Sequence, residues 1–151
     1  PWAPSMIVPL SVAVAVAPVA VAPVHATGIP DERIRRVRLG EGGSRCSSFE
    51  IEQDIGGADT GSVLWSSSVV LATMLRRSAA KWGLAGGSSV VELGAGLGLV
   101  SIAASCLGAS VLSTDGDDAI LPWTRRNLLH NLDGGSGRVL VRQLWWGDAP
   151  A

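Results

Sequence analysis

The chain has 151 residues, which is room for one domain of ordinary size, and 17% of them are charged, fewer than in an average soluble domain. Twelve basic and thirteen acidic side chains give a formal net charge of −1. This balance excludes a protein held to nucleic acid by bulk charge, and it excludes a charge-extended disordered chain. The chain begins with Pro1 and not with an initiator Met, so we expect a fragment of a longer product.

Residues 1–30 form a leader that contains no Asp, Glu, Lys or Arg, and residues 6–24 are almost entirely Ala, Val and Pro. This apolar stretch is close to the roughly 20 residues of a membrane-spanning helix. Recurring prolines and β-branched valines disfavour a helix, and no basic segment precedes the stretch as in a secretory signal. We therefore expect a disordered or extended leader and no membrane partner, with a targeting remnant or a membrane anchor as the alternatives.

Two cysteines, Cys46 and Cys106, lie far apart, and neither has a second Cys or a His at metal-ligand spacing. We expect two unlinked thiols, no metal site and a reducing, cytoplasmic location.

Folded character begins near Asp31. Alternating apolar and polar residues predict two short strands, at residues 33–39 and 48–53, joined by a glycine-rich loop. The first strand carries four arginines without interleaved aromatic residues, which indicates a solvated strand face and not a nucleic-acid site. Next, apolar residues at helical spacing follow three serines at 66–68, one of which we expect to cap the helix.

From residue 88 onward, strand and helix patterns alternate with glycine turns between them. This alternation predicts βαβ units and a parallel sheet. Pro122 lies inside the second helical pattern and indicates an early bend or a delayed start. The predicted elements are strands at 89–93, 109–115 and 138–144 and helices at 99–107 and 117–131.

A glycine turn with Gly94, Gly96 and Gly98 joins the first of these strands to its helix. Such a turn lets a ligand approach the backbone, because no Cβ atom stands in the way, and the helix N-terminus offers free N–H groups. Asp115 ends the next strand, where a carboxylate can accept two hydrogen bonds from a ribose diol. Together these features predict a site for a nucleoside-bearing cofactor at the C-terminal edge of the sheet.

The spacing of the glycines narrows the class of cofactor. A dinucleotide fingerprint requires its third glycine at position 99, which is Leu99 here, so a nicotinamide-dependent oxidoreductase is disfavoured. The chain also lacks the G-x-x-x-x-G-K-[ST] loop of nucleoside triphosphatases.

With these motifs the sequence resembles the class I S-adenosylmethionine-dependent methyltransferases and, more narrowly, the protein-lysine methyltransferases of methyltransferase family 16. The resemblance covers roughly residues 49–148 and implies the N-terminal half of a Rossmann-like fold, with a partial S-adenosylmethionine-binding domain at residues 31–151. Ser66 stands where many relatives have Pro, and we expect the chain to stop before the family's Asp-x-x-Tyr-like element. The matching segments are 61–72, 90–100, 108–115, Asn127 with Asn131, and 144–148.

By the same resemblance, the cofactor is S-adenosylmethionine, no metal is needed and no catalytic residue is assigned. Asn127 and Asn131 are expected to be structural, Trp145 a core or interface aromatic residue, and His130 a surface residue. The residues implied to bind the cofactor are Trp65, Glu92, Gly94, Gly96, Gly98, Asp115 and Trp146.

The function implied is methyl transfer to a protein side chain, with lysine as the acceptor and a protein as the partner. The alternative is a non-catalytic, truncated methyltransferase-like interaction module. For both, we expect the strand at 89–93 to have an exposed edge, because its neighbour in the family's sheet is missing. We expect poor solubility unless a partner or a second copy covers that edge.

Overall fold

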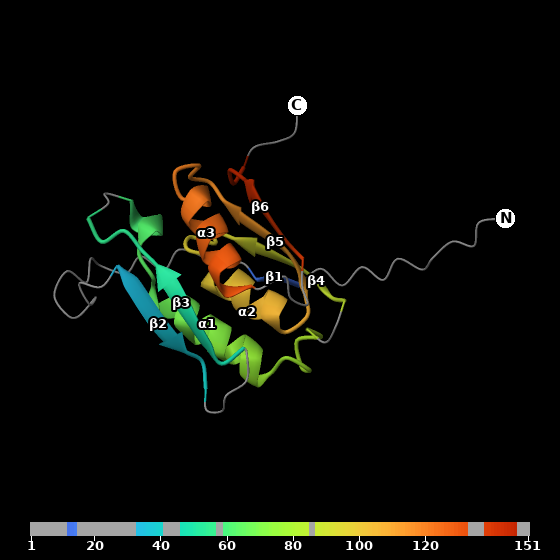
Figure 1. Ribbon diagram of the computed structural model, residues 1–151. Coiled ribbons are helices and arrows are strands. Elements are labelled where there is room, and N and C mark those ends of the chain that lie inside the picture. Colours follow the sequence, from blue (N-terminus) through green and yellow to red (C-terminus); the bar gives the residue numbers. More distant parts are fainter. Residues whose placement is uncertain are drawn as a thin grey trace.

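A computed structural model describes residues 12–14, 33–40, 46–56, 59–84, 87–132 and 138–147 (Figure 1). The rest of the leader, the glycine-rich loop at 41–45 and Asp148 lie outside the described residues. The helices are α1 (Ser66–Arg77), α2 (Leu99–Cys106) and α3 (Leu121–Asn131), and a short 3-10 turn covers Thr60–Ser62. The strands are β1 (Val12–Val14), β2 (Ile34–Arg38), β3 (Ser48–Glu52), β4 (Ser89–Leu93), β5 (Ser110–Asp115) and β6 (Val139–Gln143).

The main sheet has the order β1-β4-β5-β6, and its strands are parallel, as the alternating pattern predicted. Because crossovers between neighbouring parallel strands are right-handed, α2 and α3 lie on the same face of this sheet (Figure 1). On the other face, Val91, Leu112 and Leu140 stand side by side in register. Val91 is 38% exposed and Leu140 is 56% exposed, so no described element covers this row.

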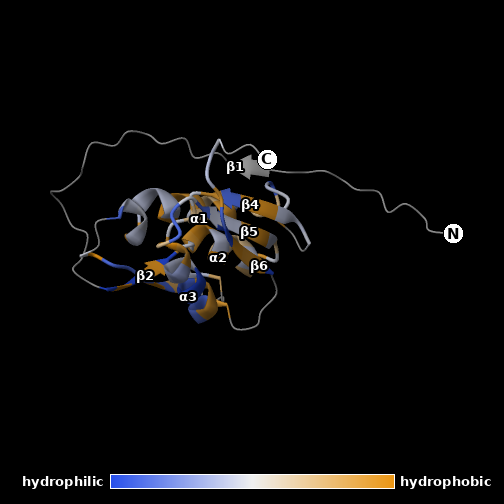
Figure 2. Ribbon diagram, turned by 90° about the horizontal axis from the view of Figure 1, so that it is seen from above, coloured by the Kyte–Doolittle hydropathy of each residue, from blue (hydrophilic) through white to orange (hydrophobic). Residues whose placement is uncertain are grey.

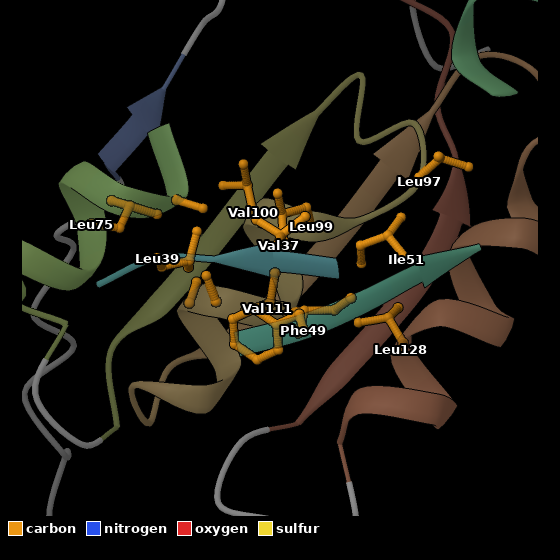
Figure 3. Packing of buried hydrophobic residues seen from close by; sticks show 14 of the residues in the cluster. Val37, Leu39, Phe49, Ile51, Leu75, Leu97, Leu99, Val100, Val111 and Leu128 are labelled. Atoms are coloured by element: carbon orange, nitrogen blue, oxygen red, sulfur yellow. The ribbon is translucent and has the colours of Figure 1, made fainter. Parts of the chain in front are cut away.

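The second sheet is the antiparallel hairpin β2–β3, which packs on the helices from the side away from the main sheet. Every residue of α2 from 99 to 105 is buried, because this apolar helix lies between the main sheet and the hairpin. Figure 3 shows Phe49 and Ile51 of the hairpin pointing into the same cluster as Leu99 and Val111. This core fixes the position of the turn that begins α2.

Two helix starts differ in detail from the sequence pattern. The cap of α1 is Trp65, with no side-chain hydrogen bond, so the predicted serine cap is wrong. The hydroxyl of Ser68 instead donates to the carbonyl oxygen of Trp65 at 2.6 Å. α3 begins at Leu121 and not at residue 117, so the delayed start that Pro122 indicated is confirmed. Pro122 lies in the first turn, where a missing N–H removes no helical bond.

A disulfide joins Cys46 and Cys106, which are 60 residues apart in the sequence. The prediction of two unlinked thiols is therefore wrong. The bond depends on a tertiary contact, because the segment just before β3 lies against the C-terminal end of α2. The spacing of the two cysteines along the chain cannot reveal this contact. The cytoplasmic location stays a prediction, without the support of free thiols.

The edge of β4 also differs from expectation. The structure pairs β1, a piece of the leader, in parallel with β4, so the same chain covers the edge that was expected to be exposed. Within the described parts of the chain, no helix is both long and apolar enough to span a bilayer.

Three of the four arginines at residues 33–38 are exposed, as predicted, and two of them meet the acidic residues of β3. The prediction is wrong for Arg35, which is half-buried and donates to the carbonyl oxygen of Leu64 at 3.0 Å. Arg33 pairs with Glu52 at 3.0 Å, and Arg36 pairs with Glu50 at 2.7 Å. Figure 2 shows hydrophilic, blue segments next to hydrophobic, orange ones in and around the hairpin. The exposed ion pairs contribute little stability each.

Candidate functional site

A cavity of about 750 Å³ lies between α1 and β4, and its lining extends along β4 to the glycine turn. Its α1 wall includes Val70 and Met74, which are exposed apolar side chains one helical turn apart. The glycine turn and the strand β4 form the opposite wall. The cavity has the size and the apolar character of a site for a small organic ligand.

The backbone of the glycine turn requires its glycines. Gly94, Gly96 and Gly98 have φ values of +67°, +51° and +83°, in the left-handed region that L side chains rarely adopt. A Cβ atom at Gly98 would also lie 3.0 Å from Cγ2 of Thr124. Because α2 begins directly after Gly98, its free N–H groups lie at this turn.

Asp115, at the end of β5, is bonded to the turn itself. The N–H of Gly96 donates to Oδ2 of Asp115 at 2.8 Å, and the N–H of Asp117 donates to Oδ1 at 3.1 Å. A second link runs from the N–H of Ala95 to the carbonyl oxygen of Thr114 at 2.9 Å. The structure therefore brings together the two features that the sequence paired, the glycine turn and the strand-end acid.

Glu92 lies just before the turn, and its side chain is directed at α2. The hydroxyl of Ser101 donates to its carboxylate. The pKa of Glu92 is raised to about 7, mainly because the carboxyl is buried; the nearby charge of Asp115 adds to this rise, and the hydrogen bond from Ser101 opposes it. The carboxyl of Glu92 thus links β4 to α2 next to the glycine turn, and its charge changes with pH near neutrality.

Two partly exposed tryptophans line the cavity. Trp65 is 49% exposed, and its indole Nε1 donates to the carbonyl oxygen of Thr60 at 2.7 Å. Trp146 is 58% exposed and lies over Gly94, where a Cβ atom would be 3.5 Å from the indole ring. Both side chains offer flat apolar surface beside the glycine turn.

Trp145 does not lie in the core, because it is 58% exposed, so of its two predicted settings the core is wrong. Its ring lies against Gly116, where a Cβ atom would be 3.4 Å away. Since Gly116 directly follows Asp115, Trp145 lies next to the end of β5, whereas Trp146 lies over Gly94 and lines the cavity.

Ser101 and Thr124 support the site, and the sequence analysis did not single them out. The hydroxyl of Thr124 donates to the carbonyl oxygen of Gly96 at 2.6 Å and so fixes the turn from α3. Both residues are buried hydroxyls in the first turns of α2 and α3. A polar residue inside an apolar helical pattern, as at Ser101 and Thr124, was the feature of the sequence that could have identified them.

His130 is an exposed side chain whose Nε2 lies 3.2 Å from Glu50, in keeping with a surface role. Asn127 and Asn131 bind the backbone of β3 and are structural, as the resemblance implied.

The sequence model of methyltransferase family 16, described as lysine methyltransferase, matches residues 44–150. The chain belongs to this lysine methyltransferase family. It is 41% identical over 101 residues to protein N-lysine methyltransferase METTL21A of Xenopus tropicalis, a match that covers 66% of this chain and 45% of that protein. It is 29% identical over 133 residues to protein-lysine N-methyltransferase EFM6 of Saccharomyces cerevisiae, covering 79% and 53%. The chain thus spans about half the length of the relatives that it matches.

Membership of a methyltransferase family implies in general the use of S-adenosylmethionine as methyl donor. The described residues fit such a group in three respects. At its three glycines the turn has no Cβ atom that would block an approach to the backbone, the carboxylate of Asp115 stands at the end of the neighbouring strand, and the cavity beside the turn is apolar.

Proposed function

We propose that this chain carries the cofactor site of an S-adenosylmethionine-dependent protein-lysine methyltransferase. The observation that supports it most is the bond between the N–H of Gly96, which lines the apolar cavity, and the carboxylate of Asp115. A carboxylate held in this way keeps lone pairs for the ribose hydroxyls, because each of its oxygens accepts one backbone hydrogen bond and can accept a second.

Each candidate residue has a role in this proposal. Gly94, Gly96 and Gly98 line the methionine and ribose portion, where any side chain would intrude. Trp65 and Trp146 offer their faces to the adenine ring and the cationic sulfonium. Glu92 sets the turn from below and, through water, attracts the amino group of the methionine end.

The methyl donor supplies a methyl group activated by a positively charged sulfur, which passes directly to a nucleophilic nitrogen. The residues of the chain align the methyl donor with the acceptor amine and surround the amine with apolar side chains. Val70, Met74 and Val91 make the cavity apolar, and an apolar environment lowers the pKa of an amine. A lysine side chain entering this cavity therefore loses its proton more readily and becomes nucleophilic.

Calorimetric titration of the full chain with S-adenosylmethionine tests the site. We expect heat of binding in the wild type and an affinity about 10-fold to 100-fold lower in Asp115→Ala, which loses hydrogen bonds to a charged acceptor. Asp118→Ala is the matched control, because it removes the same charge from an exposed position three residues away and leaves affinity unchanged. No heat from the wild type at millimolar ligand contradicts the proposal.

An interaction module without activity is the second candidate. It is favoured by the lining of the cavity, in which Glu92 is the one ionisable side chain among the described residues, so no further group there accepts the proton of an amine. Transfer of a labelled methyl group from the donor to lysate proteins distinguishes the two functions. Incorporation that Asp115→Ala abolishes supports the enzyme, and binding without incorporation supports the module.

A further inference from the structure

The hairpin β2–β3 carries two polar side chains on the face that packs on the core. Arg35 of β2 is in register with the buried Ile51 of β3, and Gln53, directly after β3, continues the row of Ile51. Arg35 is half-buried and Gln53 is fully buried. Burying a polar side chain costs free energy unless it is hydrogen-bonded, so both side chains need partners at this place.

One partner that the two side chains share is the backbone of Leu64. Nη1 of Arg35 donates to the carbonyl oxygen of Leu64 at 3.0 Å, and the N–H of Leu64 donates to Oε1 of Gln53 at 3.1 Å. Leu64 is buried, so its backbone groups require such partners. Two strands of the hairpin therefore hold the main chain at one residue, just before α1 begins.

Trp65 follows Leu64 directly and belongs to the candidate site, whereas the hairpin does not. Leu64 and Trp65 line the cavity, and no described residue of β2 or β3 does. The same segment lies on the glycine turn, since a Cβ atom at Gly96 would be 3.4 Å from the carbonyl oxygen of Gly61. A displacement of Leu64 therefore changes where the ring of Trp65 lies relative to the turn.

We propose that Arg35 and Gln53 are positioning residues of the cofactor site and act through Trp65. The inference rests on the proposed function, in which the face of Trp65 lies against the methyl donor. The bond from Nε1 of Trp65 to Thr60 holds the ring, and the bonds to Leu64 hold the backbone before it. A ring that is fixed before the ligand arrives loses little freedom on binding, so it gives a higher affinity than a mobile ring.

Calorimetric titration of the full chain with S-adenosylmethionine measures the effect on affinity. Arg35→Met keeps an apolar stem and loses every donor, and we expect it to lower the affinity about 5-fold to 10-fold. Arg35→Lys restores most of the affinity, because one N–H donor is enough for the carbonyl oxygen of Leu64. Arg36→Met is the matched control and leaves the affinity unchanged, since the side chain of Arg36 lies on the exposed face of β2.

A double-mutant cycle tests whether Arg35 acts through the ring of Trp65. In a Trp65→Ala background, we expect Arg35→Met to change the affinity by less than about 2-fold, because the ring that Arg35 positions is gone. Trp65 is 49% exposed, so its removal leaves the core intact. An equal loss of affinity with and without Trp65 overturns the proposal, and so does an unchanged affinity in Arg35→Met alone.

Fluorine NMR of the full chain labelled with fluorotryptophan follows the ring without the methyl donor. The resonance that Trp65→Phe removes belongs to Trp65. We expect this resonance to shift or broaden in Arg35→Met, to return in Arg35→Lys and to stay in place in Arg36→Met, while urea denaturation shows that each variant is folded. An unmoved resonance in Arg35→Met overturns this proposal and leaves the proposed function standing. A wild type that does not bind S-adenosylmethionine overturns both.

Discussion

The side-chain amide of Asn127 binds both backbone groups of Glu52: Nδ2 donates to the carbonyl oxygen at 3.0 Å, and Oδ1 accepts from the N–H at 2.8 Å. Asn131, one helical turn further, repeats this with Glu50 at 2.7 and 2.9 Å. Two amides of α3 thus take the place of a neighbouring strand at the edge of β3. Because Nδ2 of Asn127 also donates to the carbonyl oxygen of Leu97 at 3.1 Å, the hairpin and the glycine turn share one anchor.

Asn127→Ala leaves the buried backbone groups of Glu52 without partners, and each such group costs about 1–3 kcal/mol. We expect a loss of roughly 2–4 kcal/mol in the free energy of unfolding, measured by urea denaturation. Asn131→Ala is the comparison, since Asn131 is partly exposed and water can replace its bonds. A loss no larger for Asn127→Ala than for Asn131→Ala contradicts the role of Asn127 as the main anchor.

The raised pKa of Glu92 makes stability depend on pH. The folded chain holds this proton more tightly than the unfolded chain, since the pKa moves from its ordinary 4.5 to about 7. The stabilising contribution is therefore complete below pH 4.5 and is lost as the pH rises through 7. Relative to Glu92→Gln, which keeps an acceptor for Ser101, the wild type loses stability on the order of 3 kcal/mol across this range.

Urea midpoints of the wild type and Glu92→Gln, measured from pH 4.5 to pH 8, check this difference. Ser101→Ala removes the hydrogen bond that lowers the pKa of Glu92, so it moves the fall in stability to higher pH. Parallel curves for the wild type and Glu92→Gln are incompatible with a carboxyl that titrates near neutrality.

Gly98→Ala combines two costs, a left-handed backbone and the contact with Cγ2 of Thr124 at 3.0 Å. The backbone alone costs about 1–2 kcal/mol, and it is isolated by Gly83→Ala, because Gly83 has a φ of +65° and open space around its Cβ position. We expect Gly98→Ala to be the more destabilising change in thermal denaturation. Adding Thr124→Ser removes Cγ2, keeps the hydroxyl bonded to Gly96, and recovers the excess. If Thr124→Ser does not restore stability, the excess destabilisation of Gly98→Ala does not come from the contact with Cγ2 of Thr124.

The disulfide closes a loop of 60 residues, and cross-linking a loop of that length stabilises a protein by up to about 4 kcal/mol through the entropy of the unfolded chain. Thermal denaturation with and without a reductant measures this term. We expect the melting temperature to fall on reduction, whereas Cys46→Ser/Cys106→Ser melts at the reduced value in both conditions. A wild-type melting temperature that a reductant leaves unchanged argues against the bond.

Local patterns were sufficient for most of the fold and for the centre of the site. β4, α2 and β5 begin and end within a residue of their predicted bounds, because each lies between glycines or a strand-end acid that stop the pattern. The link between Gly96 and Asp115 follows from the parallel arrangement, which brings the ends of β4 and β5 to one edge.

Features that depend on distant contacts were beyond local patterns. The disulfide forms only because the hairpin packs on α2. The β1–β4 pairing joins two segments far apart in the sequence, and the local pattern of the leader did not indicate a strand. The cap of α1 failed for a different reason: three serines in a row satisfy the same cap preference, and the structure starts the helix before any of them can act.

The disulfide also governs how the chain responds to a protease. With the exception of Trp146, the described residues that line the cavity lie between Cys46 and Cys106 in the sequence. A single cut anywhere in this interval therefore leaves both products joined by a covalent bond. Nicked molecules migrate as one species on a non-reducing gel and separate once the bond is reduced, so one break opens the ring that holds the wall of the cavity but does not release either piece.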